Sequence, residues 1–156
     1  FEVNGSEVGE EIKFTVGSAY RATLRVDVMS RTPIDRVEFI QNGRVIETVD
    51  ARGAKTYLLE KSVEIKQSSW FAARVYGPGA PGLTTRAMAH SSAVYVTGDG
   101  KPTLVREDLE IAIRWVDRLW AYLVERDNFG SRENRDSARE MIDQARGHYQ
   151  DKLRTM

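Results

Sequence analysis

The sequence predicts a mainly β fold with a helical end: an immunoglobulin-like antiparallel β-sandwich of about seven strands, followed by an antiparallel pair of helices packed on it. Two observations predict this class. Up to about residue 97 apolar and polar residues alternate with period two, and beyond residue 100 the apolar period becomes 3.6. We therefore expect a β-sandwich over residues 1–100 and a helical hairpin over residues 101–156, packed together as one structural unit.

The sandwich strands are predicted from alternation and from turn residues. Ala22, Leu24, Val26 and Val28 alternate with polar residues, as in a half-buried strand. Asn42-Gly43 divides residues 36–49 into a hairpin, because this dipeptide readily supplies positive φ at both centres of a type I′ turn. Further strands are expected at residues 12–16, 56–66, 70–76 and 88–97, with a glycine- and proline-rich surface loop at residues 77–82.

The predicted hairpin has apolar residues on both faces. Val37 and Phe39 have one parity and Ile40 has the other, and the second strand carries both Val45 and Ile46. We therefore expect a cover on each side of this hairpin, of which the opposite sheet supplies only one.

Two helices follow Gly98-Asp99-Gly100. The first is expected from about residue 104 to 126, and the second begins after Ser131, a plausible N-cap. Their apolar stripes comprise Leu109, Ala112, Ile113, Val116, Leu119, Trp120 and Leu123 in the first helix, and Ala138, Met141, Ile142, Ala145, Tyr149 and Leu153 in the second.

The first helix carries a second apolar surface. At about 100° per residue, Ile111, Trp115 and Tyr122 fall on a flank distinct from its main stripe. The simplest arrangement puts this helix in the middle, between the sheet and the second helix. The flank is alternatively a contact surface for another domain, and Ile111, Trp115, Tyr122 and His90 are the candidate interface residues.

Composition excludes several classes of function. Lys plus Arg and Asp plus Glu both number 23, so no net charge draws the chain to nucleic acid or to an anionic membrane. The absence of cysteine excludes disulfides, thiolate catalysis and cysteine-ligated metals. No apolar run approaches the roughly 20 residues needed to cross a bilayer, so we expect neither a nucleic-acid nor a membrane partner.

Few residues are candidates for chemistry. His90 could act as a base or reach a neighbouring active site, but a local structural hydrogen bond is the favoured explanation, and His148 has no second ligand at metal-binding spacing. Glu7, Glu10 and Glu11 are acidic neighbours without the ladder of a calcium loop. Trp70 could stack on a sugar, although either Trp70 or the alternating Phe71 must face the core. We predict no catalytic, cofactor-binding or metal-binding residue in the chain.

Four segments, taken in order, resemble a known family. They are Phe1 to Gly5 with Gly9, Pro33 to Gly43, Ser69 to Gly77, and Ala89 to Val96. Together they resemble the C-terminal region of the CehA/McbA-like metallohydrolases, whose metal-binding catalytic domain belongs to the PHP (polymerase and histidinol phosphatase) superfamily and precedes this region. One departure is Ala93, where a proline commonly stands in that family.

The resemblance implies a functional class. The chain would be a non-catalytic accessory domain that packs against, or supports, an upstream catalytic domain of the same polypeptide, with all metal ligands upstream. The start at Phe1, inside an extended pattern, agrees with trimmed upstream sequence. The alternatives are a carbohydrate-binding or adhesive module and a self-association module that forms a homodimer through the first helix.

Overall fold

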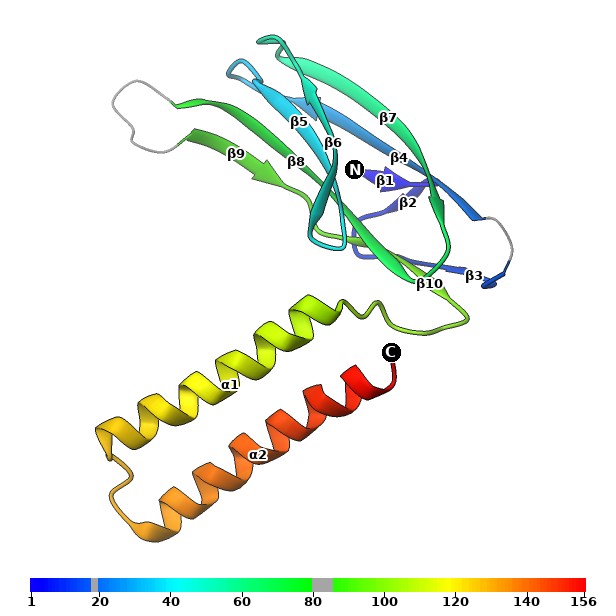
Figure 1. The fold of residues 1–156 in the computed structure, drawn as a ribbon. Coiled ribbons are helices and arrows are strands. Elements are labelled where there is room, and N and C mark those ends of the chain that lie inside the picture. The colour runs from blue at the N-terminus through cyan, green and yellow to red at the C-terminus, as the bar shows by residue number, and fades with distance from the viewer. Residues whose placement is uncertain (18–19, 80–85) are drawn as a thin grey trace. The chain divides into compact units, whose positions relative to one another are not determined.

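The computed structural model describes residues 1–17, 20–79 and 86–156 and divides the chain into two compact units, Phe1–Thr103 and Leu104–Met156 (Figure 1). The first unit contains all the described strands and the second contains both described helices. The elements are β1 (Glu2–Val3), β2 (Ser6–Glu7), β3 (Glu11–Phe14), β4 (Tyr20–Met29), β5 (Arg36–Gln41), β6 (Arg44–Asp50), β7 (Thr56–Ile65), β8 (Ser69–Gly79), β9 (Arg86–His90), β10 (Val94–Gly98), α1 (Arg106–Arg126) and α2 (Arg132–Arg154).

The described strands form two sheets, one in the order β2-β1-β4-β7 and the other in the order β3-β10-β8-β5-β6. The strand β9 also pairs with β8, on the same side as β10. A β-rich fold with C-terminal helices is therefore confirmed, with ten strands among the described residues where about seven were expected. One pairing departs from the antiparallel prediction, because β3 runs parallel to β10 with Glu11 opposite Tyr95.

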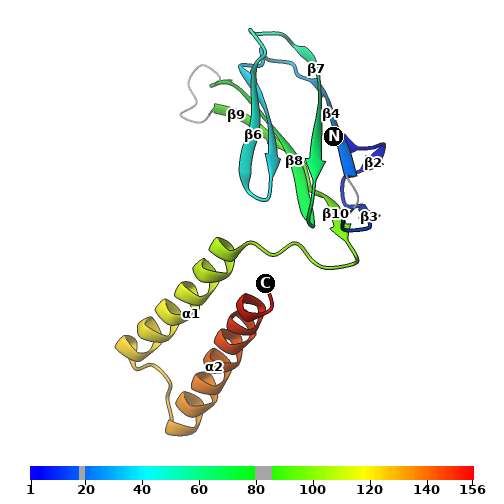
Figure 2. The same cartoon turned by 45° about the vertical axis from the view of Figure 1, so that its right-hand side comes forward.

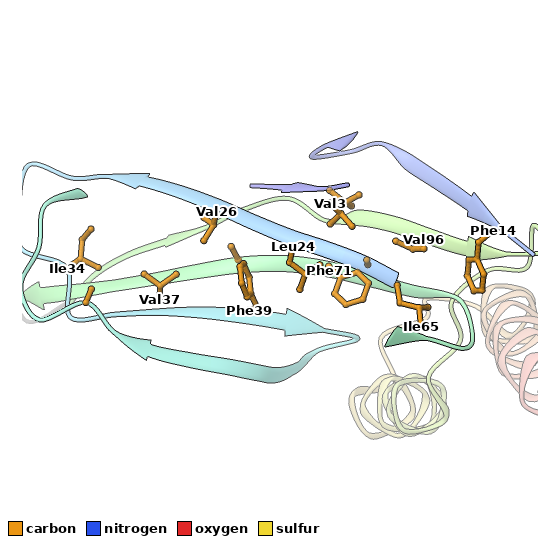
Figure 3. Packing of buried hydrophobic residues seen from close by; sticks show 14 residues of the cluster. Val3, Phe14, Leu24, Val26, Ile34, Val37, Phe39, Ile65, Phe71 and Val96 are labelled. Carbon is orange, nitrogen blue, oxygen red and sulfur yellow. The ribbon is translucent and has the colours of Figure 1, made fainter. Parts of the chain in front are cut away.

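Side chains from both sheets meet in one apolar core (Figure 3). Leu24 of β4, Phe39 of β5 and Phe71 of β8 are fully buried and belong to the same cluster. Burial of a side chain of this size stabilises a fold by about 1.5–3 kcal/mol. The alternation predicted for β4 is confirmed, because Ala22, Leu24 and Val26 are buried while Thr23 and Asp27 are exposed.

The hairpin of β5 and β6 follows the Asn42-Gly43 prediction. Both turn residues have positive φ, 50° for Asn42 and 81° for Gly43. Val37, Glu38, Phe39 and Ile40 are all buried, so β5 is covered on both faces as its mixed parity predicts. The neighbouring strand β6 is not covered on both faces, because its Val45 is exposed.

The last predicted strand, residues 88–97, is broken in two. The backbone leaves the ladder at residues 91–93, between β9 and β10. There Ser91 donates its N–H to the carbonyl oxygen of Ala73 (3.0 Å) and accepts the N–H of Ala73 on its hydroxyl (2.9 Å). This hydroxyl satisfies a backbone donor of β8 where regular pairing is interrupted.

The predicted surface loop at residues 77–82 is wrong for its first three residues. β8 continues through Gly77 to Gly79, and residues 80–82 lie outside the described part of the chain. Gly77 is in close contact with another segment, because a β-carbon on it would lie 2.8 Å from the carbonyl oxygen of Pro33. The absence of a side chain therefore allows these two backbones to approach.

The second unit is an antiparallel helical hairpin, with α1 and α2 side by side in both views (Figures 1 and 2). The hydroxyl of Ser131 accepts the backbone N–H of Asn134 at 3.1 Å, which confirms the predicted N-cap of α2. Asp117 of α1 accepts hydrogen bonds from the guanidinium of Arg146 in α2, the Nε bond being 2.8 Å long. The expectation that this hairpin packs on the sheets, with α1 in the middle, stays a prediction.

Two residues of the predicted helix stripes were assigned to the wrong face. Leu119 is 49% exposed and Met141 is 71% exposed, whereas Leu109 and Ile142 are buried. At about 100° per residue Leu119 falls between the two apolar surfaces of α1, and Met141 falls at the margin of the α2 stripe. Periodicity alone therefore could not determine their burial.

Candidate functional site

His90 is the last residue of β9, directly before the break in the strand. Its Nδ1 lies 2.6 Å from the carbonyl oxygen of Ser91, and the residue is exposed. Its cross-strand partner is Arg74 of β8. The local hydrogen bond expected as the simpler explanation of His90 is therefore present.

A buried carboxylate lies on the outer face of β5, two strands from His90 with Arg74 of β8 between them. Glu38 accepts hydrogen bonds from Nε of Arg36 on Oε1 (2.7 Å) and from Nε and Nη2 of Arg74 on Oε2 (2.9 and 2.7 Å). The guanidinium of Arg36 also lies 3.9 Å from the ring centroid of Tyr76. We call Glu38, Arg36, Arg74 and Tyr76 the Glu38 cluster.

The electrostatics of the Glu38 cluster keep its carboxylate ionised. Burial alone raises the pKa of Glu38, but the hydrogen bonds and charges of Arg36 and Arg74 outweigh burial and hold the pKa below its ordinary value. A general acid or base at neutral pH needs a pKa near 7. The Glu38 cluster is therefore suited to joining β5 and β8 rather than to proton transfer.

Sequence reasoning did not predict the Glu38 cluster. Glu38 and Arg74 are 36 positions apart and become neighbours only through the pairing of β5 with β8. The available signal was Glu38 itself, a charged residue inside the predicted two-faced hairpin, where a buried charge requires a partner.

The acidic residues near the start of the chain also take part in local structure. Glu10 accepts the backbone N–H of Glu7 at 2.8 Å, and Glu11 accepts the hydroxyl of Thr97 at 2.7 Å. Across the described ranges, no group of three or more His, Cys, Asp or Glu side chains is arranged to hold a metal ion.

Trp70 lies on the outer face of its sheet. Phe71 is the neighbour that enters the core, which resolves the facing that alternation left open. The backbone N–H of Trp70 donates to Oδ1 of Asn42 (2.9 Å), so β8 is tied to the β5–β6 turn. Tyr95 of β10, opposite Trp70 in register, is 46% exposed.

A shallow groove of about 190 Å³ lies where the end of β4 approaches β8 and β9. Its lining is mainly apolar and includes Val28, Met29, Ile34, Val75, Met88 and Ala89. Met29 and Met88 are both largely exposed. Methionine-lined surfaces adapt well to apolar partners, so the groove is a candidate contact surface.

Four of the exposed large apolar side chains of the helical unit lie on α1. Ile111, Trp115, Leu119 and Tyr122 are 43%, 64%, 49% and 49% exposed. We call these four residues the α1 outer stripe; it contains all three helical residues predicted for an interface, together with Leu119. The opposite side of α1 belongs to the pairing with α2, where the guanidinium of Arg139 lies 4.9 Å from the Trp120 ring centroid.

The four residues predicted for an interface belong to two different units of the structure. His90 belongs to the β unit and the α1 outer stripe to the helical unit. His148, on α2, is exposed and meets the ring of Tyr149 edge-on at 5.5 Å between centroids.

Neither of the described helices has the length and apolarity required of a membrane span. No protein-family model, curated protein or solved structure matches the chain.

Proposed function

We propose that this chain is a non-catalytic accessory domain, an immunoglobulin-like β-sandwich with a helical hairpin, that packs against a catalytic domain upstream in the same polypeptide. The observation that carries the proposal is the contrast between two kinds of side chain. Glu38, Glu11 and His90 make structural hydrogen bonds within the β unit, whereas large apolar side chains such as Met88 and Trp115 are exposed. Exposed apolar surface of this kind is typical of sites of protein contact.

The β9 face is the surface we assign to the upstream domain. Met88 and His90 are two residues apart and therefore lie on the same side of this strand. Their cross-strand partners in β8 are Tyr76 and Arg74, respectively. Met88 is 62% exposed and also lines the apolar groove. A contact here would combine an apolar centre with a polar rim, which is the usual composition of a protein interface.

The parent protein is proposed to be a PHP-type metal-dependent hydrolase. This rests on the ordered resemblance of four segments to the CehA/McbA-like metallohydrolases, and it assigns every metal ligand to the upstream domain. The gene upstream of the Phe1 codon tests it directly. A histidine-rich metal-binding domain in the same reading frame is the expected result, and an unrelated domain there would refute the assignment.

Assays on the chain test its lack of catalysis. The purified chain, supplied with Zn²⁺ or Mn²⁺, is expected to give no turnover of a chromogenic phosphate ester or carboxylic ester above the buffer blank. Elemental analysis after dialysis should find no stoichiometric metal. Turnover that a chelator abolishes and added metal restores would contradict the proposal.

Substitution in the full-length parent tests the β9 face. Met88→Asp is expected to lower the thermal stability of the catalytic domain, because it introduces an unpaired charge into the contact. Leu58→Asp is the matched control, since Leu58 is exposed on the other sheet. Equal effects of the two variants would exclude a contact at β9.

A carbohydrate-binding role is the second candidate, favoured by the cross-strand pair of Trp70 and Tyr95 on one outer face. Neighbouring aromatic rings on a flat sheet can stack on sugar rings. A glycan array distinguishes the two proposals: binding that Tyr95→Ala removes would favour this candidate, and a blank array would favour the accessory role.

A further inference from the structure

We infer that the α1 outer stripe pairs antiparallel with the same stripe of a second copy of the chain. This inference does not depend on the proposed accessory role, because it concerns only contacts between identical helices. The four side chains of the stripe fall within an arc of about 80° on the helix surface. They form one continuous apolar row along α1.

The charges at the ends of this row select the partner and its orientation. Asp108, in the first turn of α1, and Arg126, in its last turn, are about five helical turns apart and therefore lie on the same line of the helix surface. The guanidinium of Arg126 lies 4.7 Å from the ring centroid of Tyr122, which fixes the positive charge at one end of the stripe. The stripe thus has an acidic end and a basic end.

Only the antiparallel arrangement brings opposite charges together. In an antiparallel pair, residues on the same flank of the two helices face each other, so Asp108 of each copy meets Arg126 of the other. A parallel pair would bring the two Asp108 side chains together and the two Arg126 side chains together. Like charges that face each other destabilise a contact, so the stripe is self-complementary in one orientation.

The middle of the stripe fits the same arrangement. The two-fold axis would cross α1 at the level of residue 117, midway between the two end charges and on the side of the helix away from the Asp117–Arg146 contact. Trp115 of each copy then lies at the level of Leu119 in the other copy, so apolar side chains of the two stripes meet on either side of the axis. The four-helix assembly that results leaves the α1–α2 contacts of each copy unchanged.

The first experiment measures association of the whole chain. Sedimentation velocity between 5 and 500 µM (on the order of typical weak-dimer concentrations) should show a monomer–dimer equilibrium. Trp115→Ala should raise the dissociation constant about tenfold or more, because a central tryptophan is a common hot spot. Met141→Ala, an exposed apolar residue on α2 outside the stripe, is the control and should leave the constant unchanged. A monomeric wild-type chain, or a dimer insensitive to Trp115→Ala, overturns the inference.

The second experiment measures orientation by charge reversal. D108R and R126D alone should each weaken the dimer, because each creates two like-charge contacts in the antiparallel pair. The D108R/R126D double variant should recover association, and an equimolar mixture of the two single variants should form a heterodimer tighter than either homodimer. Circular dichroism verifies that α1 remains helical in every variant. A dimer that neither single reversal weakens has a different geometry, and that result also overturns the inference.

Discussion

Glu38 is a buried charge whose cost is offset by two guanidinium groups. Its side chain is 7% exposed, while those of Arg36 and Arg74 are 36% and 29% exposed. Removing one partner from such a pair leaves the other charges without compensation. The Glu38 cluster therefore stabilises the pairing of β5 with β8 and makes that pairing sensitive to pH.

Glu38→Gln should lower the free energy of unfolding by about 1–2 kcal/mol at pH 7, since charged hydrogen bonds are lost at a site where the arginines remain partly solvated. The pKa of Glu38 is lowered in the folded state, so its contribution is present above the ordinary carboxyl value of 4.5 and is lost as the pH falls through the lowered value. Urea unfolding at pH 7 and below pH 4.5 measures both effects. The difference between wild type and variant should shrink on acidification.

Glu64→Gln is the control for that prediction. Glu64 is exposed and lies 3.3 Å from Lys66, so its loss should change stability by less than about 0.5 kcal/mol at either pH. Equal losses in the two variants would mean that the Glu38 cluster has no special role.

At Gly77 there is no room for a side chain, because a β-carbon would contact the backbone of Pro33. Gly77→Ala should destabilise the β unit by about 1–3 kcal/mol, because the new β-carbon would contact the carbonyl oxygen of Pro33, which a rotamer change cannot relieve. Chemical denaturation followed by circular dichroism measures the loss.

Gly147→Ala is the matched substitution in an open position. Gly147 lies inside α2, and its added β-carbon would meet no atom within 4 Å apart from its chain neighbours and the adjacent helix backbone. Alanine is favoured over glycine inside helices by up to about 1 kcal/mol, so this variant should gain stability. A gain in both glycine variants would contradict the close approach at Gly77.

Among the elements, the β5–β6 hairpin depends most on one turn residue. Asn42 has a φ of 50°, accepts the N–H of Trp70 on its side chain and donates its own N–H to the Trp70 carbonyl (3.1 Å). Asn42→Ala should cost about 1–3 kcal/mol, because alanine tolerates this φ poorly and has no side-chain acceptor. Asn42→Asp retains both properties and should lose less than half as much in the same unfolding experiment. Equal losses would show that the turn is held by its flanking strands alone.

The elements that sequence predicted well are those with local signals. Alternation predicted β4, Asn42-Gly43 predicted the hairpin, and Ser131 predicted the start of α2. β1 and β2 were missed because two residues each are too few to show a period. They are joined instead by a second turn of positive φ, at Asn4 and Gly5, whose sequence signal resembles that of Asn42-Gly43.

The break between β9 and β10 had no such signal. Residues 91–93 contain neither glycine nor proline, and the apolar alternation on either side suggested one continuous strand. The interruption depends on Ser91 hydrogen bonds to another strand, and these exist only in the folded chain. The same reason explains why Glu38 was missed while Ile111, Trp115 and Tyr122 were identified: helical neighbours are close in sequence, and cross-strand neighbours are not.

At the scale of the whole molecule, the two units differ in how their contacts are made. In the helical unit, α1 and α2 are consecutive elements joined by a short connection. The β unit instead joins segments that are distant in sequence, because Val3 pairs with Leu24 and Ile12 with Val96. Proteins dominated by such non-local pairings fold more slowly than helical hairpins.

The parallel pairing of β3 with β10 has a consequence for synthesis on the ribosome. Glu11–Phe14 is translated before the other strands of its sheet, but its partner Val94–Gly98 is the last described strand of the unit to emerge. Until then β3 has an unfilled edge, which is the kind of surface that nascent chains expose to aggregation or to chaperones. This sheet can therefore be completed only after residue 98 has left the ribosome. A ribosome that pauses before residue 94 would hold the nascent chain with its second sheet incomplete.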